Sequence, residues 1–297
     1  MKIIKPSVMF IPQPAGLEGV YKQVELAGRT AYKSEDKITD VSAEKFVKML
    51  MNKKHGAALE HGTIYLKYRC KWEGDSFTKF YEDNPYSDVV VKFNKDDYEN
   101  GWAMSTFYIT TNYRVIIENN RSKDLQYLSN PCKYHIQRYT FKFILSRGIA
   151  NEFVRHRVFS FLQESTRYCN YSKDKFGGVS FISSIECPLE IGEYKVNNKM
   201  EIIKDGKVYL SEKELTCLSQ DKVLLYAYCN SEHLYLSLLD KGMKPQIARD
   251  VLPLGLKTEL IMTGTKKQWE EFINLRSAND AHPDARILAD EVKKILL

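Results

Sequence analysis

The sequence predicts an α+β protein, because strand-like and helix-like segments are both present along one chain. Residues 139–145 read Tyr-Thr-Phe-Lys-Phe-Ile-Leu, an aromatic and β-branched run typical of a strand. Asp205-Gly206 stands between two short apolar runs, which is a strong signal for a hairpin. Elsewhere apolar residues recur at helical spacing, most clearly over residues 211–241.

Length and composition indicate a soluble globular protein. The chain has 297 residues, of which 43% are hydrophobic and 28% are charged. The net charge of +6 favours an anionic ligand but is mild for a nucleic-acid-binding protein. No run approaches the roughly 18 apolar residues that span a membrane, and the N-terminal apolar run is too short for a signal peptide. We therefore expect a cytoplasmic protein without a membrane partner.

The N-terminal part predicts helices and strands in alternation. Residues 1–12 favour a first strand, and residues 16–31 favour a helix. Ser42 is expected to cap the next helix, which stops near His55. Residues 63–68 alternate apolar and polar side chains, as a half-buried strand does.

Residues 69–138 are interpreted as an inserted segment, either a small β meander or extra helices. Three strand-like runs lie within it, at residues 89–93, 108–111 and 113–117.

The C-terminal part continues this mixture. A helix capped by Ser146 is expected to lead into Arg155. Ser211 is expected to open a long helix that ends at Gly242. The remaining predicted elements are a strand at 258–265 and helices at 266–276 and 284–296.

The cluster Arg155-His156-Arg157 is the strongest candidate for a ligand site. Arginine suits phosphate because its planar fork donates paired hydrogen bonds and stays charged. On a continuous helix, Arg155 and Arg157 would point about 160° apart, at about 100° per residue. They would then serve two parts of a ligand or two subunits, unless the helix ends here. The alternative is a basic helix end with solvated arginines.

Further motifs follow this cluster in a fixed order. Ser165 comes after seven intervening residues and is followed by Arg167-Tyr168. Together with three other segments, this pattern resembles the signature of flavin-dependent thymidylate synthases. Those segments are Leu59-Glu60-His61, the Ala-Arg-x-x-Leu-Pro run at 248–253, and Asn274-Leu275-Arg276. The resemblance covers roughly residues 1–66, 139–172 and 244–297, with insertions at about 69–138 and 176–240.

This resemblance implies a fold, a reaction and an assembly. The fold would be a mixed or antiparallel sheet flanked by helices, in a single catalytic domain over residues 1–297. The enzyme would methylate dUMP to dTMP, with methylenetetrahydrofolate as carbon donor and FAD, reduced by NADPH, as hydride carrier. It would be a homotetramer with shared active sites, and no nucleic-acid partner is expected.

The resemblance also implies residue roles. Arg276 would stabilise negative charge on the uracil. Ser165 is a second catalytic candidate, but a binding role is favoured for it because no base that could activate its hydroxyl is evident. The dUMP-binding residues would be Glu152, Arg155, Gln163, Glu164, Ser165, Thr166, Arg167, Arg249 and Arg276. The FAD-binding residues would be His61, Arg155, His156, Arg157, Lys267 and Glu271, and no metal site is implied.

Two acidic residues depart from the family pattern. Glu152 stands where the family often has Gln, and it can pair with an arginine instead. In the segment 264–271, where the family tends to offer Asn and Arg to FAD, this chain has Thr265, Lys267 and Glu271. These departures leave open an inactive flavin-binding relative, and the basic and aromatic content leaves open a nucleic-acid-binding module.

The cysteines offer little support for a different chemistry. All six are scattered without a Cys-x-x-Cys pair, so free thiols are expected and a zinc site is not. Cys132 and His135 loosely resemble the Pro-Cys-His of cysteine-dependent thymidylate synthases, but two residues separate them and the surrounding pattern is missing.

Overall fold

The computed structural model describes residues 1–99, 101–167, 169–173, 176–197, 199–210 and 218–296. Tyr168 and the predicted helix start at Ser211 lie outside the described residues.

A four-stranded antiparallel sheet forms the centre of the molecule, with the strand order β2-β6-β13-β7. The two inner strands pair along their full lengths, from Lys257 opposite Ser146 to Thr265 opposite Arg138. Both inner strands confirm the sequence prediction. The bounds are Ser7–Ile11 for β2, Arg138–Ser146 for β6, Lys257–Thr265 for β13 and Ser160–Gln163 for β7.

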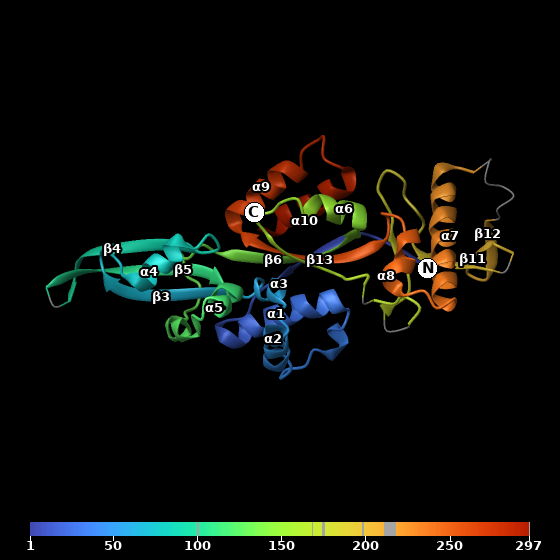
Figure 1. The fold of residues 1–297 in the computed structure, drawn as a ribbon. Helices are drawn as coiled ribbons and strands as arrows, with labels where there is room; N and C mark the ends of the chain where they lie inside the picture. Colours follow the sequence, from blue (N-terminus) through green and yellow to red (C-terminus); the bar gives the residue numbers. More distant parts are fainter. Residues whose placement is uncertain (100, 168, 174–175, 198, 211–217, 297) are drawn as a thin grey trace.

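Helices cover both faces of this sheet, so the prediction of an α+β fold is confirmed (Figure 1). One face carries α6 (Arg147–Phe153), α9 (Lys266–Arg276) and α10 (Pro283–Leu296). The other face carries α1 (Gly16–Tyr32), with α2 (Ala43–Asn52) and α3 (Gly56–Leu59) beside it. The predicted helices at 16–31, 266–276 and 284–296 are therefore confirmed.

Trp269 on α9 is the centre of the core between α9 and the sheet. Its side chain is fully buried, and its ring centroid lies 4.8 Å from that of Phe141 and 4.6 Å from that of Phe159. Its indole nitrogen donates a hydrogen bond to the Tyr139 carbonyl at 3.0 Å. The alternating apolar residues of β6 thus pack against the apolar side of α9.

A three-stranded antiparallel sheet projects from the central sheet as an arm (Figure 1). Its strands are β3 (Thr63–Lys71), β4 (Asp88–Glu99) and β5 (Trp102–Asn112). The order is β3-β5-β4, so β5 lies in the middle and the segment is not a simple meander. Helix α4 (Ser76–Asp83) packs on one face of this sheet, where the ring centroids of Phe77 and Tyr68 are 4.3 Å apart.

One strand predicted in this segment is wrong. Residues 113–117 lie in helix α5 (Tyr113–Glu118), although Val115, Ile116 and Ile117 favour a strand by propensity. The Asn112 side chain accepts a hydrogen bond from the Val115 N–H and so caps the helix. The 3₁₀ segment η2 (Ser122–Tyr127) follows.

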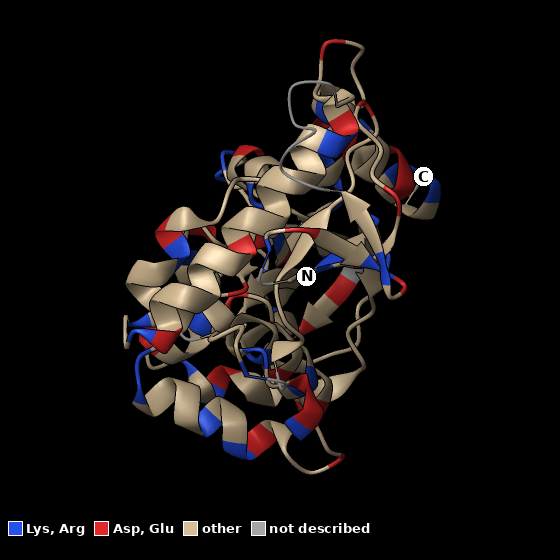
Figure 2. Ribbon diagram, turned by 90° about the vertical axis from the view of Figure 1, so that its right-hand side faces the viewer, with Lys and Arg blue, Asp and Glu red and all other residues tan. Residues whose placement is uncertain are grey.

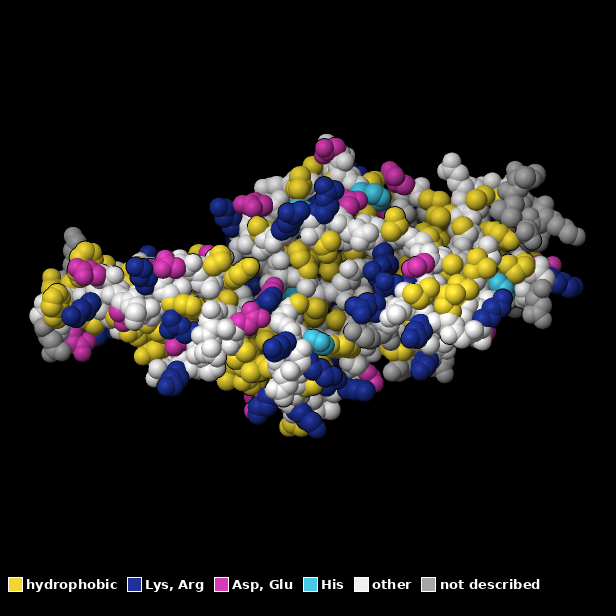
Figure 3. All heavy atoms as spheres, in the orientation of Figure 1, with side chains coloured by type: hydrophobic (Ala, Val, Ile, Leu, Met, Phe, Trp, Pro, Cys, Tyr) yellow, Lys and Arg dark blue, Asp and Glu magenta, His cyan; other side chains and the backbone are white. Residues whose placement is uncertain are grey.

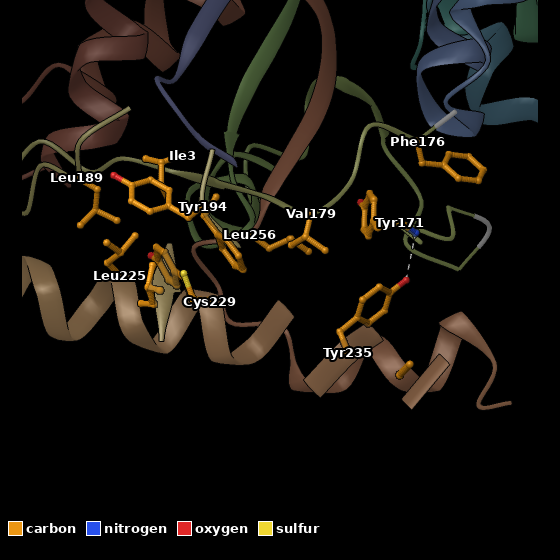
Figure 4. Packing of buried hydrophobic residues seen from close by; sticks show 14 of the residues in the cluster. Ile3, Tyr171, Phe176, Val179, Leu189, Tyr194, Leu225, Cys229, Tyr235 and Leu256 are labelled. Atoms are coloured by element: carbon orange, nitrogen blue, oxygen red, sulfur yellow. Dashed lines mark hydrogen bonds between the residues drawn. The ribbon is translucent and has the colours of Figure 1, made fainter. Parts of the chain in front are cut away.

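Buried residues between Cys169 and Leu256, together with Ile3, form a second core at the opposite end of the molecule from the arm (Figures 1 and 4). Its long helix α7 (Gln220–Asp240) packs Tyr235 beneath Tyr171, whose N–H donates to the Tyr235 hydroxyl at 3.3 Å. The small strands are β1 (Lys2–Ile4), β8 (Ser180–Ile182), β9 (Gly192–Glu193), β10 (Lys195–Val196), β11 (Ile202–Lys204) and β12 (Lys207–Leu210).

The hairpin predicted at Asp205-Gly206 joins β11 to β12 and is confirmed. Both residues have positive φ, 50° and 78°, as a tight hairpin turn requires. The cap predicted at Ser42 is not: its hydroxyl donates to Glu25 and to the Thr39 carbonyl instead of accepting from the helix. The short elements η1 (Glu35–Lys37), α8 (Pro245–Ala248) and η5 (Arg249–Val251) complete the description.

Charged residues of both signs are interspersed along the helices (Figure 2). None of the described helices combines the length and the apolar character needed to cross a membrane.

Replacing Trp269 by Ala should lower the free energy of unfolding by about 3–5 kcal/mol, because it removes a large buried ring and leaves a cavity. Urea denaturation followed by circular dichroism measures the change. The matched control is Trp72→Ala, since Trp72 is 54% exposed. Equal losses in the two variants would contradict the central position of Trp269.

Candidate functional site

The Arg-His-Arg cluster directly follows a short helix. Ser146 caps α6 by accepting the Ile149 N–H at 3.3 Å, as predicted, and the helix ends at Phe153. Arg155 and Arg157 therefore lie in the turn after the helix, and both are exposed. The large angle expected for a continuous helix does not apply, because the helix ends first.

Arg276, at the end of α9, joins the distant Asn-Leu-Arg segment to this cluster. Its Nε donates to His156 Nε2 at 3.0 Å. One terminal nitrogen donates to the Glu152 carboxylate at 2.7 Å, and the other donates to the Glu152 carbonyl at 2.8 Å. Glu152 thus pairs with an arginine, which was the structural role left open for it in the sequence.

His156 is held as a neutral ring. Burial lowers its pKa to about 4, and the positive charge of Arg276 adds to that effect. Because Nε2 accepts from Arg276, the ring proton is on Nδ1. The ring borders a cavity of about 430 Å³ lined by Arg155, His156, Leu275, Arg276, Asp280 and Ala281.

Ser165 borders a different cavity, of about 460 Å³, between the end of β7 and helices α1 to α3. The Ser165 N–H donates to the Ala31 carbonyl, which ties this segment to the end of α1. The Ser165 hydroxyl accepts the Arg167 N–H at 3.3 Å. Gln163 lines the same cavity and donates to Thr258.

Two further residues of this cavity were missed by the sequence reasoning. Tyr32 and His55 stack with ring centroids 6.1 Å apart, and the Tyr32 hydroxyl lies 2.5 Å from His55 Nδ1. In the sequence, His55 resembles a residue at the end of a helix. The one sequence feature that could have indicated a site is its position five residues before the Glu60-His61 motif.

Glu164 supports the Ser165 segment from beneath. Its side chain is fully buried, accepts the Tyr171 hydroxyl at 3.0 Å and pairs with Lys257 at 2.9 Å. Next to it, burial alone would raise the pKa of Glu259, but the charges of Lys257, Lys142 and Lys33 outweigh burial and hold it far below its usual value. In this arrangement Glu164 positions the segment that carries Ser165. Arg249 also contacts this segment, because it donates a hydrogen bond to the Thr166 hydroxyl at 2.8 Å.

The remaining residues expected near FAD lie apart from one another. His61 is fully buried on the α1 side of the sheet, where its Nδ1 lies 2.8 Å from the Thr263 hydroxyl. Burial lowers its pKa to about 3, and the charge of Arg138 adds to that effect. Lys267 and Glu271 are exposed on α9, one helical turn apart.

The predicted residues thus form two groups within one chain. Glu152, Arg155 and Arg276 lie with α6 and α9, whereas Gln163 and Ser165 border the cavity beside α1. The two cavities share no lining residue. A single chain therefore does not bring the predicted nucleotide-binding residues together.

The family model described as thymidylate synthase complementing protein, Thy1, matches residues 135–297. This match covers more than half of the chain. The chain belongs to the Thy1 family. The Arg-His-Arg cluster, Arg249 and Arg276 all lie inside the matched part, whereas the arm precedes it.

Relatives of this Thy1 chain include two proteins with similar names. A "Probable flavin-dependent thymidylate synthase" of Paramecium bursaria Chlorella virus 1 is 29% identical over 152 residues, which are 51% of this chain but only 62% of that relative. A flavin-dependent thymidylate synthase of Aquifex aeolicus is 21% identical over 319 aligned residues, covering 94% of this chain and 95% of the relative.

Among solved structures, the UMP/dUMP methylase PolB from Streptomyces cacaoi aligns with a TM-score of 0.41 and 17% identity. The alignment covers 99% of this chain and 91% of that one.

Stability should fall as the pH is lowered from about 6.5 to about 5, partly because of His61. Its pKa of about 3 in the folded state lies below the usual value near 6.5, so the unfolded chain takes up a proton that the folded chain does not. Urea denaturation over this pH range should show a shallower pH slope for His61→Asn. The control is His233→Asn, since His233 is exposed; an unchanged slope in His61→Asn would contradict the assignment.

Proposed function

We propose that the protein is a flavin-dependent thymidylate synthase that methylates dUMP to dTMP. Methylenetetrahydrofolate would donate the carbon, and NADPH would be the reductant. Membership of the Thy1 family and the names of the relatives support this. The observation that carries the proposal is the binding of Arg276 to His156 and Glu152, since it unites two signature motifs that are 120 residues apart.

The residues beside the first cavity fit a cofactor with phosphate groups, as FAD is. Arg155 and Arg157 are exposed, always charged and able to bind phosphate oxygens in pairs. The neutral His156 ring lines the same cavity and offers a flat surface. These three residues would hold FAD, which when bound and reduced supplies the hydride for the transferred carbon.

The chain's own residues would bind and polarise dUMP. The Ser165 hydroxyl would donate a hydrogen bond to the dUMP phosphate, and the guanidinium groups of Arg167 and Arg249 would neutralise the charge of that phosphate. Arg276 would place positive charge near a uracil carbonyl, where negative charge develops as C5 attacks the carbon donor. His156 would keep Arg276 in place through the Nε hydrogen bond. Glu164 and Lys257 would fix the segment that carries Ser165.

We further propose that one active site is built from two chains. The Arg276 group and the Ser165 group border separate cavities in one chain, so a second copy must supply one of them. A homotetramer with shared sites satisfies this requirement. The chain would then act as a single catalytic domain, to which the arm and the segment at 176–240 are additions, working in the cytoplasm.

The purified protein should release tritium from dUMP labelled at C5 when FAD, NADPH and methylenetetrahydrofolate are present. Arg276→Ala should lower the rate by at least about 100-fold, as expected for loss of a group that stabilises developing charge. Its flavin absorbance should remain. Arg286→Ala removes a guanidinium group whose one described side-chain hydrogen bond is a long one to the Asn279 carbonyl, and it should keep full activity. Full activity of Arg276→Ala would contradict its role.

The two-chain site predicts complementation between inactive variants. Arg276→Ala and Ser165→Ala chains should each be weakly active alone. After the two are mixed, unfolded and refolded together, mixed assemblies contain sites with both residues intact, so tritium release should recover in part. Mixing Arg276→Ala with itself is the control. No recovery in assemblies shown by mass spectrometry to be mixed would contradict sharing.

A further inference from the structure

The arm, residues 63–134, lies outside the part of the chain matched by the family model. It contains ten basic and ten acidic residues, so its net charge is zero. On the face turned to the viewer in Figure 3, side chains of both signs and hydrophobic side chains are interspersed. What distinguishes the arm is a group of lysines that its sheet places among aromatic rings on one face.

Strand register places the lysines on the face opposite α4. Lys67 pairs with Tyr108, and Tyr108 pairs with Val90 on its other side. Because alternate residues of a strand share a face, Lys71 and Lys92 lie on the same side as Lys67. The face that carries α4 has acidic side chains, Asp75, Glu82 and Asp83, together with Lys79.

Aromatic rings lie among these lysines. Tyr134, on the segment returning to the central sheet, packs 4.9 Å from Tyr108. Lys92 and Lys133 lie over the Tyr134 ring at 5.0 and 5.1 Å. Nearer the tip, Lys71 lies 3.9 Å from the ring centroid of Trp102. We name this set the basic face: Lys67, Lys71, Lys92, Trp102, Tyr108, Lys133 and Tyr134.

The four lysines of the basic face have no carboxylate partner among the described residues. Arg69 lies between Lys67 and Lys71 on the same side and differs from them, because it pairs with Asp97 and with Glu99. Two acidic residues also lie on this side, Asp88 at the base of β4 and Glu99 opposite Trp102. The lysines are therefore available to an external anion.

We propose that the basic face binds single-stranded nucleic acid. The exposed ring of Trp102 and the half-buried rings of Tyr108 and Tyr134, all flanked by lysines, meet both needs of such a ligand, since bases stack on rings and phosphates pair with ammonium groups. A base stacked on a ring gains more than a lysine that lies over the ring. A base therefore displaces the lysine, whose ammonium group then turns to a phosphate.

The arrangement favours single strands over duplexes. Stacking on Trp102 or Tyr134 requires an unpaired base with a free face, which a duplex does not offer. Trp102 and Tyr108 are six residues apart on β5, which corresponds to about 20 Å. A strip of this length suits a short site, near the lower end of the about 4–16 nucleotides typical of stacking platforms.

The test uses the whole protein and a labelled oligothymidylate of about 12 nucleotides, with binding followed by fluorescence anisotropy over a series of salt concentrations. If the four lysines neutralise four phosphates, the logarithm of the binding constant should fall with the logarithm of the salt concentration with a slope of about −3. The double variant K67Q/K92Q should halve that slope and weaken binding at low salt about tenfold or more. Trp102→Ala should weaken binding at least about fivefold while the slope stays the same.

The matched control is K79Q/K123Q, which removes the same charge from exposed lysines on α4 and η2. This control should bind as the unaltered protein does. All variants should keep the tritium-release activity, because none of the substituted residues lines either cavity. The proposal would be overturned by equal weakening in the control, by equal affinity for a duplex of the same length, or by no binding at low salt. Self-association of the arm without nucleic acid would overturn it in favour of a second copy as the partner.

Discussion

The pairing of β6 with β13 is the constraint on which the rest of the structure depends. These strands are far apart in the sequence, yet their ladder runs from Ser146 to Arg138 without a break. Helix α6, which the Arg-His-Arg cluster follows, leaves the end of β6, and helix α9, which carries Arg276, leaves the end of β13. A shift of one residue would turn every apolar side chain of β6 away from Trp269. The register of two strands therefore fixes both the core and the meeting of Arg276 with His156.

Two different uses of charge follow from this framework. Around Glu164 and Glu259, buried carboxylates are matched by Lys257 and its neighbours, so the charges hold the chain in one arrangement. Buried charges without partners would destabilise the fold strongly, which explains their close pairing. On the arm, by contrast, lysines stay exposed and unmatched among the described residues, so their charge remains available to a ligand. The first arrangement is structural, and the second suits recognition.

Two sequence predictions failed where one local contact overrode propensity, and a third local arrangement, at Glu164, was not specified by the sequence pattern. The run at 113–117 has β-branched residues, but the Asn112 side chain starts a helix there. Ser42 has a residue type suited to a cap, yet its hydroxyl bonds to the buried Glu25. Glu164 lies one residue beyond β7, and its bonds to Lys257 and Tyr171 hold its side chain inward while Gln163 and Ser165 border the cavity. In each case the deciding partner is a side chain or strand that the local pattern does not specify.

The sequence by itself determined the α+β class, the two inner strands, the hairpin at Asp205-Gly206 and the motifs that indicate the family. These are local properties, set by side-chain periodicity, turn chemistry and fixed spacing. Only the tertiary structure decided that Arg276 meets Glu152, that the candidate residues divide between two cavities, and that Lys67, Lys92 and Lys133 gather on one face. Those facts depend on pairings between distant segments. Strand register brings such segments together, and no local pattern encodes it.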